Sequence, residues 1–177
     1  MLRQAKWLFY RDRVLEQLGA LLLAYPRGRQ FFRDFPGLKV EMRRQFDAGV
    51  APASAALQLA SGILSGLVRQ LGAAERTVVL ARLRSVELEE LKAIAAERNA
   101  GRRRDETAPA AFAAELAGVA IFMARGLAEE GILARQEYAW LLGELDAALG
   151  PNGAADLGAL SRHFALPERE AQGGSPA

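Results

Sequence analysis

Apolar residues recur at intervals of three and four along most of the chain, the pattern of helices that bury one side. In residues 2–24, for example, Val14, Leu18 and Leu21 fall on one side, opposite Asp12 and Glu16. No stretch alternates apolar and polar residues for long enough to predict a strand. The pattern therefore predicts an all-α protein, a bundle of seven or eight helices arranged mostly as antiparallel hairpins.

Proline and glycine mark the ends of the predicted helices. Pro52 and Pro109 stand where a first helical turn tolerates proline, and Gly131 and Gly150 follow the last residues of two helices. The predicted helices span residues 2–24, 30–34, 38–46, 53–71, 74–98, 107–130, 135–149 and 154–164.

The length of 177 residues fits one domain with a sizeable core. We expect residues 1–171 to form this single all-α domain and residues 172–177 to be a disordered tail. The segment 99–107, which is rich in arginine and acidic residues, is the strongest linker signal in the chain and the place for any sub-boundary.

Composition narrows the range of functions. Apolar residues make up 51% of the chain but aromatic residues only 7%, and the abundance of alanine, glycine and arginine is typical of a bacterial-like, GC-rich coding sequence. The chain has no cysteine and one histidine, His163, which excludes disulfide scaffolds, zinc fingers, iron–sulfur sites and thiol nucleophiles. We find no constellation of catalytic residues, so we predict a protein that is not an enzyme and that uses no cofactor and no metal.

Residues 48–68 contain no charged side chain and several small ones. The length would suffice to cross a bilayer, but the polar and small residues favour a buried central helix with a flat packing surface. From this we predict a soluble, non-catalytic interaction or adaptor protein that binds a protein partner or a second copy of itself. The residues predicted to form the binding face are Trp7, Ser61, Gly62, Ser65, Gly66 and Trp140.

The alternative prediction is a nucleic-acid-associated protein. Lysine stands at only three positions, so 20 of the 23 basic residues are arginine, although the net charge is just +2. Arginine pairs well with phosphate, and clustered arginines would make binding dependent on salt. The residues predicted for this role are Arg29, Arg33, Arg43, Arg44, Arg102, Arg103 and Arg104.

The first helix mixes aromatic and basic residues, as helices that lie on membrane surfaces do. Asp12 and Glu16 reduce its positive side, so we expect the helix to dock on the core rather than to bind a membrane. Charged residues at positions 11–13 also interrupt the apolar run before a signal-peptide core could form, which predicts a cytoplasmic protein.

Overall fold

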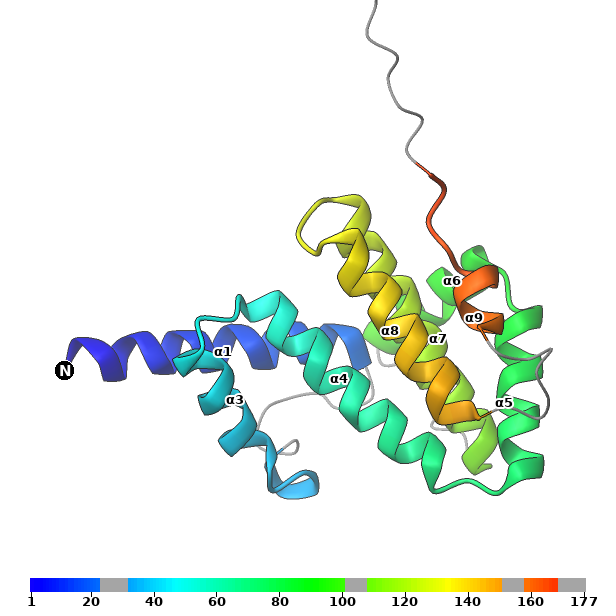
Figure 1. Ribbon diagram of the computed structural model, residues 1–177, viewed down its shortest axis with the longest axis horizontal. Helices are drawn as coiled ribbons and strands as arrows, with labels where there is room; N and C mark the ends of the chain where they lie inside the picture. The colour runs from blue at the N-terminus through cyan, green and yellow to red at the C-terminus, as the bar shows by residue number, and fades with distance from the viewer. Residues whose placement is uncertain (23–31, 101–107, 151–157, 169–177) are drawn as a thin grey trace, which may run out of the picture.

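The fold is all-α, as the hydrophobic pattern predicts. A computed structural model describes residues 1–22, 32–100, 108–150 and 158–168 of the chain (Figure 1). Within these residues there is no strand, and residues 32–34 form a short helical turn. The helices with described bounds are α1 (Leu2–Leu22), α3 (Leu38–Asp47), α4 (Pro52–Arg69), α5 (Ala73–Ser85), α6 (Leu88–Asn99), α7 (Pro109–Glu129), α8 (Arg135–Leu149) and α9 (Ala159–His163).

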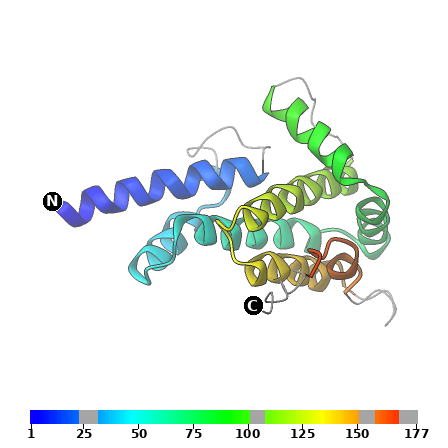
Figure 2. The ribbon, with the colours of Figure 1, turned by 90° about the horizontal axis from the view of Figure 1, so that it is seen from above.

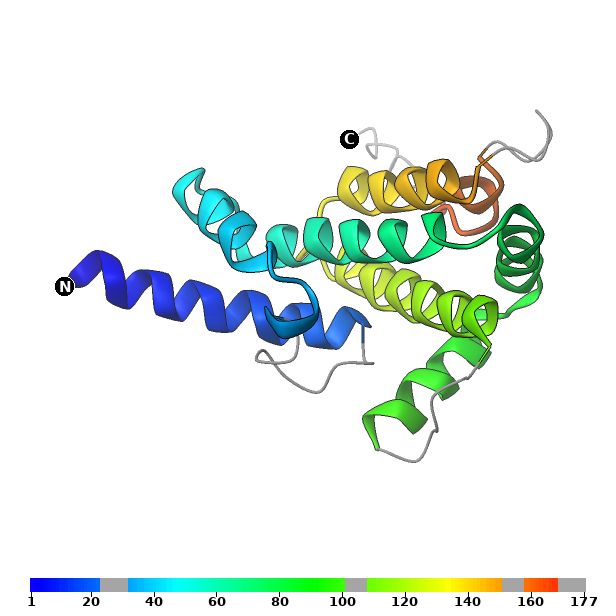
Figure 3. The ribbon, with the colours of Figure 1, turned by 90° about the horizontal axis from the view of Figure 1, so that it is seen from below.

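Three long helices, α4, α7 and α8, lie side by side and contact one another (Figure 3). α7 runs opposite to both α4 and α8, so α4 and α8 point in the same direction. α1 lies across α4 and α7, and its first half extends beyond the other helices with α3 beside it (Figures 1 and 2). α5 crosses the far end of the three helices, where it contacts α7, α8 and α9.

α7 is the central helix, and 10 of its 21 residues are alanine or glycine. Alanine and glycine let neighbouring helices approach closely, and α1, α4, α5, α6 and α8 all contact α7. It is also the one helix among the described residues that is long and apolar enough to cross a membrane, although most of it is buried inside the protein. Burial of this kind is what the core helix of a folded domain requires.

The predicted helix over residues 74–98 is wrong in one respect, because the chain breaks it into α5 and α6. Val86 and Glu87 have extended backbone dihedrals, and the hydroxyl of Ser85 donates a hydrogen bond to the carbonyl of Arg82. A straight helix of that length would be about 37 Å long and would carry its second half past α7. The break turns α6 back so that Leu91 packs against α7.

α6 docks on α7 through a close apolar contact and a buried ion pair. A side chain at Gly118 would have its Cβ 2.7 Å from Leu91 Cδ2, so any other residue there would force this leucine to move. One turn away, Arg98 Nε donates to Glu115 Oε1 at 2.6 Å, and both side chains are about 95% buried, with exposed fractions of 4% and 6%. Burying two charges is tolerated here because they neutralise each other.

The C-terminal segment is held by polar contacts to its carbonyl groups and backbone amides. α9 begins after Gly158, whose φ of 72° is one that glycine adopts readily. The Tyr138 hydroxyl and Arg125 Nη1 both donate to the carbonyl of Phe164, at 2.7 and 3.2 Å. Burial raises the pKa of Tyr138 to about 12, so its hydroxyl keeps its proton and this hydrogen bond into the alkaline range.

Several predicted segments lie wholly or partly outside the described residues. They are residues 23–24 of the first predicted helix, residues 30–31 of the second, residues 101–107 of the predicted linker, the start of the last predicted helix, residues 169–171 of the predicted domain and the predicted tail at 172–177.

Candidate interaction surface

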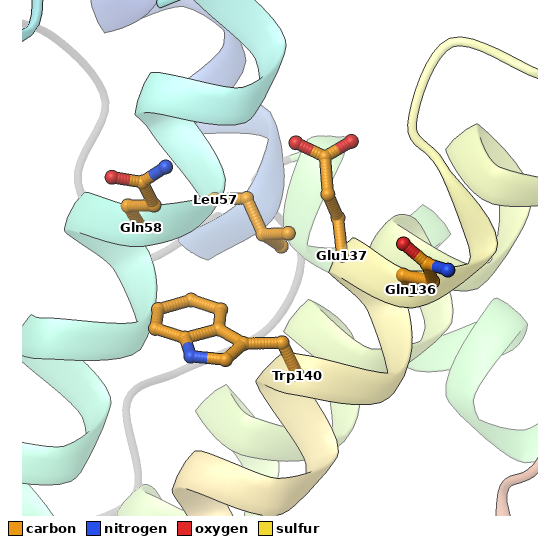
Figure 4. A pocket seen from close by; sticks show the side chains of 5 residues that line it. All are labelled: Leu57, Gln58, Gln136, Glu137 and Trp140. Carbon is orange, nitrogen blue, oxygen red and sulfur yellow. The ribbon is translucent and has the colours of Figure 1, made fainter.

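The surface where α4 and α8 meet contains a shallow hollow of about 410 Å³ (Figure 4). Figure 3 shows α4 and α8 adjacent there, and none of the other described helices covers the near side of α4. The hollow is lined by Leu57, Gln58, Gln136, Glu137 and Trp140. We call these five residues, with the exposed Gly62 and Gly143 and the half-exposed Gly66, the α4–α8 surface.

Trp140 is the largest side chain of this surface. α8 turns Tyr138, Leu141 and Leu145 into the core, and Trp140, which lies on the other side of the helix, remains 42% exposed. Its indole points across the hollow toward α4 (Figure 4). A half-exposed tryptophan beside a buried leucine offers an apolar body and one N–H donor, a combination enriched at protein interfaces.

Glu137 is fixed in place by the first turn of α8. Its Oε2 accepts a hydrogen bond from the backbone N–H of Ala134 at 2.8 Å, which is half of a capping box. Alanine has no side-chain acceptor to complete the box, so Glu137 alone caps this helix end. The carboxylate therefore stands at the rim of the hollow in a defined position.

Gln58 connects this surface to α3. Gln45 is buried in α3 and donates from Nε2 to Gln58 Oε1 at 3.0 Å. Along α4, Gly62 and Gly66 follow Gln58 at four-residue spacing, and a Cβ added at either glycine would meet nothing within 4 Å. The outer side of α4 is therefore flat and open, which lets another backbone approach it.

The structure separates the six residues predicted to form one binding face. Gly62, Gly66 and Trp140 are exposed or half-exposed on the α4–α8 surface. Ser61 and Ser65 are buried in the core, because a one-residue step along a helix rotates a side chain by about 100° away from the neighbouring glycines. The sixth residue, Trp7, is also buried and lies in a different part of the protein, on α1.

Trp7 belongs to an aromatic cluster between α1 and α3. Its ring lies 6.3 Å from Tyr10 and 5.5 Å from Phe46, measured between centroids. The guanidinium of Arg43 stands 5.1 Å from the centre of the Trp7 ring. Trp7 thus anchors α1 to α3, and burial raises the pKa of the neighbouring Tyr10.

The predicted arginine face is described only in part. Arg33 pairs with Asp34, and Arg43 pairs with Asp47 at 3.5 Å. Arg44 donates from Nε to Glu41 at 2.9 Å, and this hydrogen bond lowers the pKa of Glu41. The other predicted arginines, at positions 29 and 102–104, lie outside the described residues. Nucleic-acid binding stays a prediction, and three of its seven arginines have carboxylate partners within the chain.

A second exposed apolar area lies on the first half of α1. We call residues 2–13 the α1 arm, because this part of the helix extends beyond α4, α7 and α8 (Figure 1). Phe9 is 66% exposed, and Arg13 stands over its ring with a distance of 5.6 Å from the guanidinium carbon to the ring centre. The arm borders a hollow of about 420 Å³ that is lined by Leu2, Ala5, Lys6, Phe9, Tyr10, Phe46 and Pro52.

Four residues that line the hollow were not predicted from the sequence: Leu57, Gln58, Gln136 and Glu137. The available signal was the spacing of Gln136, Trp140 and Gly143, which places a polar, an aromatic and a small residue on one side of a helix. The chemistry of the surface is that of binding: an apolar patch, two amides and one carboxylate. In the described part of the chain, no three histidine, aspartate or glutamate side chains come together as a metal site.

Comparisons of the chain with protein-family models, with curated proteins and with solved structures found no match.

Proposed function

We propose that this chain is a non-catalytic protein-binding module and that the α4–α8 surface receives an apolar helix of its partner. Trp140, half-exposed above a hollow with an apolar floor, carries the proposal. A partner that covered this indole would remove apolar area from water, and buried tryptophans rank among the side chains that contribute most to binding.

The glycines of the surface support the same function. Gly62 and Gly66 on α4 and Gly143 on α8 have open space where a side chain would stand. Each glycine weakens its own helix by up to about 1 kcal/mol relative to alanine. No close packing contact among the described residues requires glycine at these three positions. A partner helix that lies across them would make use of the missing side chains.

A photo-crosslinking amino acid tests the proposal at a chosen position. We would place it at Gln136, which is exposed and lines the hollow of the α4–α8 surface, and, as the control, at Val78, which is 46% exposed on α5. We expect an adduct from position 136 in the native cells and none from position 78. The adduct should disappear when Trp140→Ala is added. Equal adducts from both positions, or an adduct that persists in the Trp140→Ala variant, would refute the proposed function.

Nucleic-acid binding and a cytoplasmic location, both predicted from the sequence, remain predictions. Nucleic-acid binding is the alternative function, and retention of the purified chain on duplex or single-stranded nucleic acid at low salt would favour it. The cytoplasmic location stays a prediction as well.

A further inference from the structure

The α1 arm and α8 carry the same spacing of an aromatic residue between two charges. On the arm, Lys6, Phe9 and Arg13 are exposed and stand at intervals of three and four residues. Residues at this spacing share one side of a helix, with the two cations about 10 Å apart along the axis. Arg13 also pairs with Glu16 at 3.2 Å, in an exposed ion pair that a closer carboxylate can replace. The arm thus presents an aromatic ring between two positively charged side chains.

On α8 the corresponding residues are Glu137, Trp140 and Glu144, again at intervals of three and four. Trp140 is exposed and the two glutamates are half-exposed. The charges are opposite to those of the arm and stand at the same separation. The imbalance extends along the chain, since residues 1–50 contain ten basic and five acidic side chains and residues 51–177 contain thirteen and sixteen.

The position of the charges around each helix fixes the direction of pairing. Around a helix axis, the residue three positions before a given residue and the residue four positions after it are both rotated by about 40–60° in the same sense. Lys6 and Arg13 therefore lie together on one side of Phe9. Glu137 and Glu144 lie on the corresponding side of Trp140. When two helices pack face to face, such flanks meet only if the helices run antiparallel.

We propose that the occupant of the α4–α8 surface is a second copy of this chain, which binds with its α1 arm antiparallel to α8. This inference rests on the function proposed above. Phe9 of the second copy then covers Trp140, Lys6 pairs with Glu144, and Arg13 pairs with Glu137. Gly143, where a side chain would meet nothing within 4 Å, leaves space for the approaching helix.

The contact is head-to-tail, because the arm and the α4–α8 surface are different parts of the chain. A pair joined in this way still offers one free surface, on the copy that gives its arm, and one free arm, on the copy that receives it, so the association continues into a ring or an open filament. A single helix on two others makes an interface below the standard size, and its ion pairs are exposed. Assembly is therefore weak, and it depends on protein concentration and on salt.

Two single variants test the contact when they are mixed. Phe9→Ala removes the arm's aromatic ring, and Trp140→Ala removes the ring of the receiving surface. For the wild type, sedimentation velocity should show a mass that rises with concentration. Each variant alone should assemble with an affinity that is lower by about tenfold or more. The mixture should form a 1:1 complex, since one variant keeps its arm and the other keeps its surface.

Three results would overturn the proposal. They are a wild type that stays monomeric at millimolar concentration, a Phe9→Ala variant that assembles as the wild type does, and a mixture that forms no 1:1 complex. Helical circular dichroism of each variant shows whether it is folded. The rings of Phe9 and Trp140 are exposed, so we expect both alanine variants to fold. Phe9→Leu provides a second arm variant, which removes the aromatic ring and keeps an apolar side chain.

A charge exchange tests the antiparallel direction. Lys6→Glu alone and Glu144→Lys alone should each weaken assembly, because each places like charges together. Both changes in one chain should restore it, since copies of the double variant again present opposite charges at the contact. A double variant that assembles no better than the single variants overturns the antiparallel pairing.

The crosslinker at position 136 separates this inference from the proposed function. An adduct of twice the chain mass, joined to a residue of the arm, supports both. A monomeric wild type with an adduct of another mass overturns the second copy as the occupant and supports the proposed function. The absence of any adduct overturns both.

Discussion

Asp146 of α8 holds the start of α9, and its removal should destabilise the protein measurably. Its Oδ1 accepts the backbone N–H of Leu160 at 2.9 Å, and its Oδ2 accepts the backbone N–H of Ser161 at 3.1 Å. The hydroxyl of Ser161 also donates to Oδ2, at 2.7 Å. Gly158, the residue before α9, has no side chain with which to cap the helix. The carboxylate of another helix therefore replaces the missing cap.

The expected magnitude follows from these three bonds. Hydrogen bonds to charged groups contribute about 1.5–3 kcal/mol, and loss of a helix cap costs about 1 kcal/mol. The bonds are partly buried and the freed amides can reach water, so Asp146→Ala should lower the free energy of unfolding by about 2–3 kcal/mol. In a chain of this size that corresponds to a fall of about 4–12 °C in Tm. Ser161→Ala, which loses one of the three bonds, should cost about 1 kcal/mol.

Urea and thermal unfolding, followed by circular dichroism, would measure both variants and the double variant. We expect the double variant to cost less than the sum of the single ones, because Ser161→Ala has no bond left to lose once the carboxylate is gone. Hydrogen exchange should also accelerate at Leu160 and Ser161. A loss below about 0.5 kcal/mol in Asp146→Ala, or strict additivity, would refute this role for the carboxylate.

Three further predictions concern the core. Gly118→Ala should destabilise the protein relative to Gly126→Ala in the same helix, because the new methyl would stand 2.7 Å from Leu91 whereas position 126 is open. Chemical unfolding of the two variants isolates the steric cost, and equal stabilities would contradict the close contact. Ser65→Ala should keep or raise stability by up to about 1 kcal/mol, because the buried hydroxyl has no hydrogen-bond partner among the described residues; a clear loss in thermal unfolding would contradict this. The raised pKa of Tyr138, about 12, means that the folded state retains the proton longer than the unfolded state, so stability should fall from about pH 10 through about pH 12. Tyr138→Phe should show a smaller fall over that range of pH in urea unfolding, and an unchanged alkaline profile would contradict the assignment.

The helices could be predicted from the sequence because their signals are local. The predicted span 135–149 coincides with α8, which begins at its half capping box and ends before Gly150. The break at Val86 was missed because the apolar spacing continues through it. The charged residues did indicate the break. Basic residues such as Arg82 and Arg84 are favoured in the last turn of a helix, and an acidic residue such as Glu89 is favoured in the first turn of the next.

The candidate surface could be predicted only in part, because exposure depends on which neighbours cover a helix. Gly62 and Gly66 were expected at a surface and are found there. The serines one position earlier were expected beside them, yet α4 is covered on that side. Trp7 and Trp140 look alike in the sequence, and only the packing of α3 against α1 distinguishes the buried anchor from the exposed ring.

The docking of α6 on α7 has a consequence for how the chain opens. If α6 separated from α7 at its C-terminal end alone, the buried ion pair between Arg98 and Glu115 would break, and breaking a buried pair costs several kcal/mol. Partial fraying is therefore disfavoured, and α6 detaches in a single cooperative event in which both charges become hydrated. The amide protons of this helix should then exchange with one common free energy of opening, set below that of α7, rather than with a gradient from the end inward.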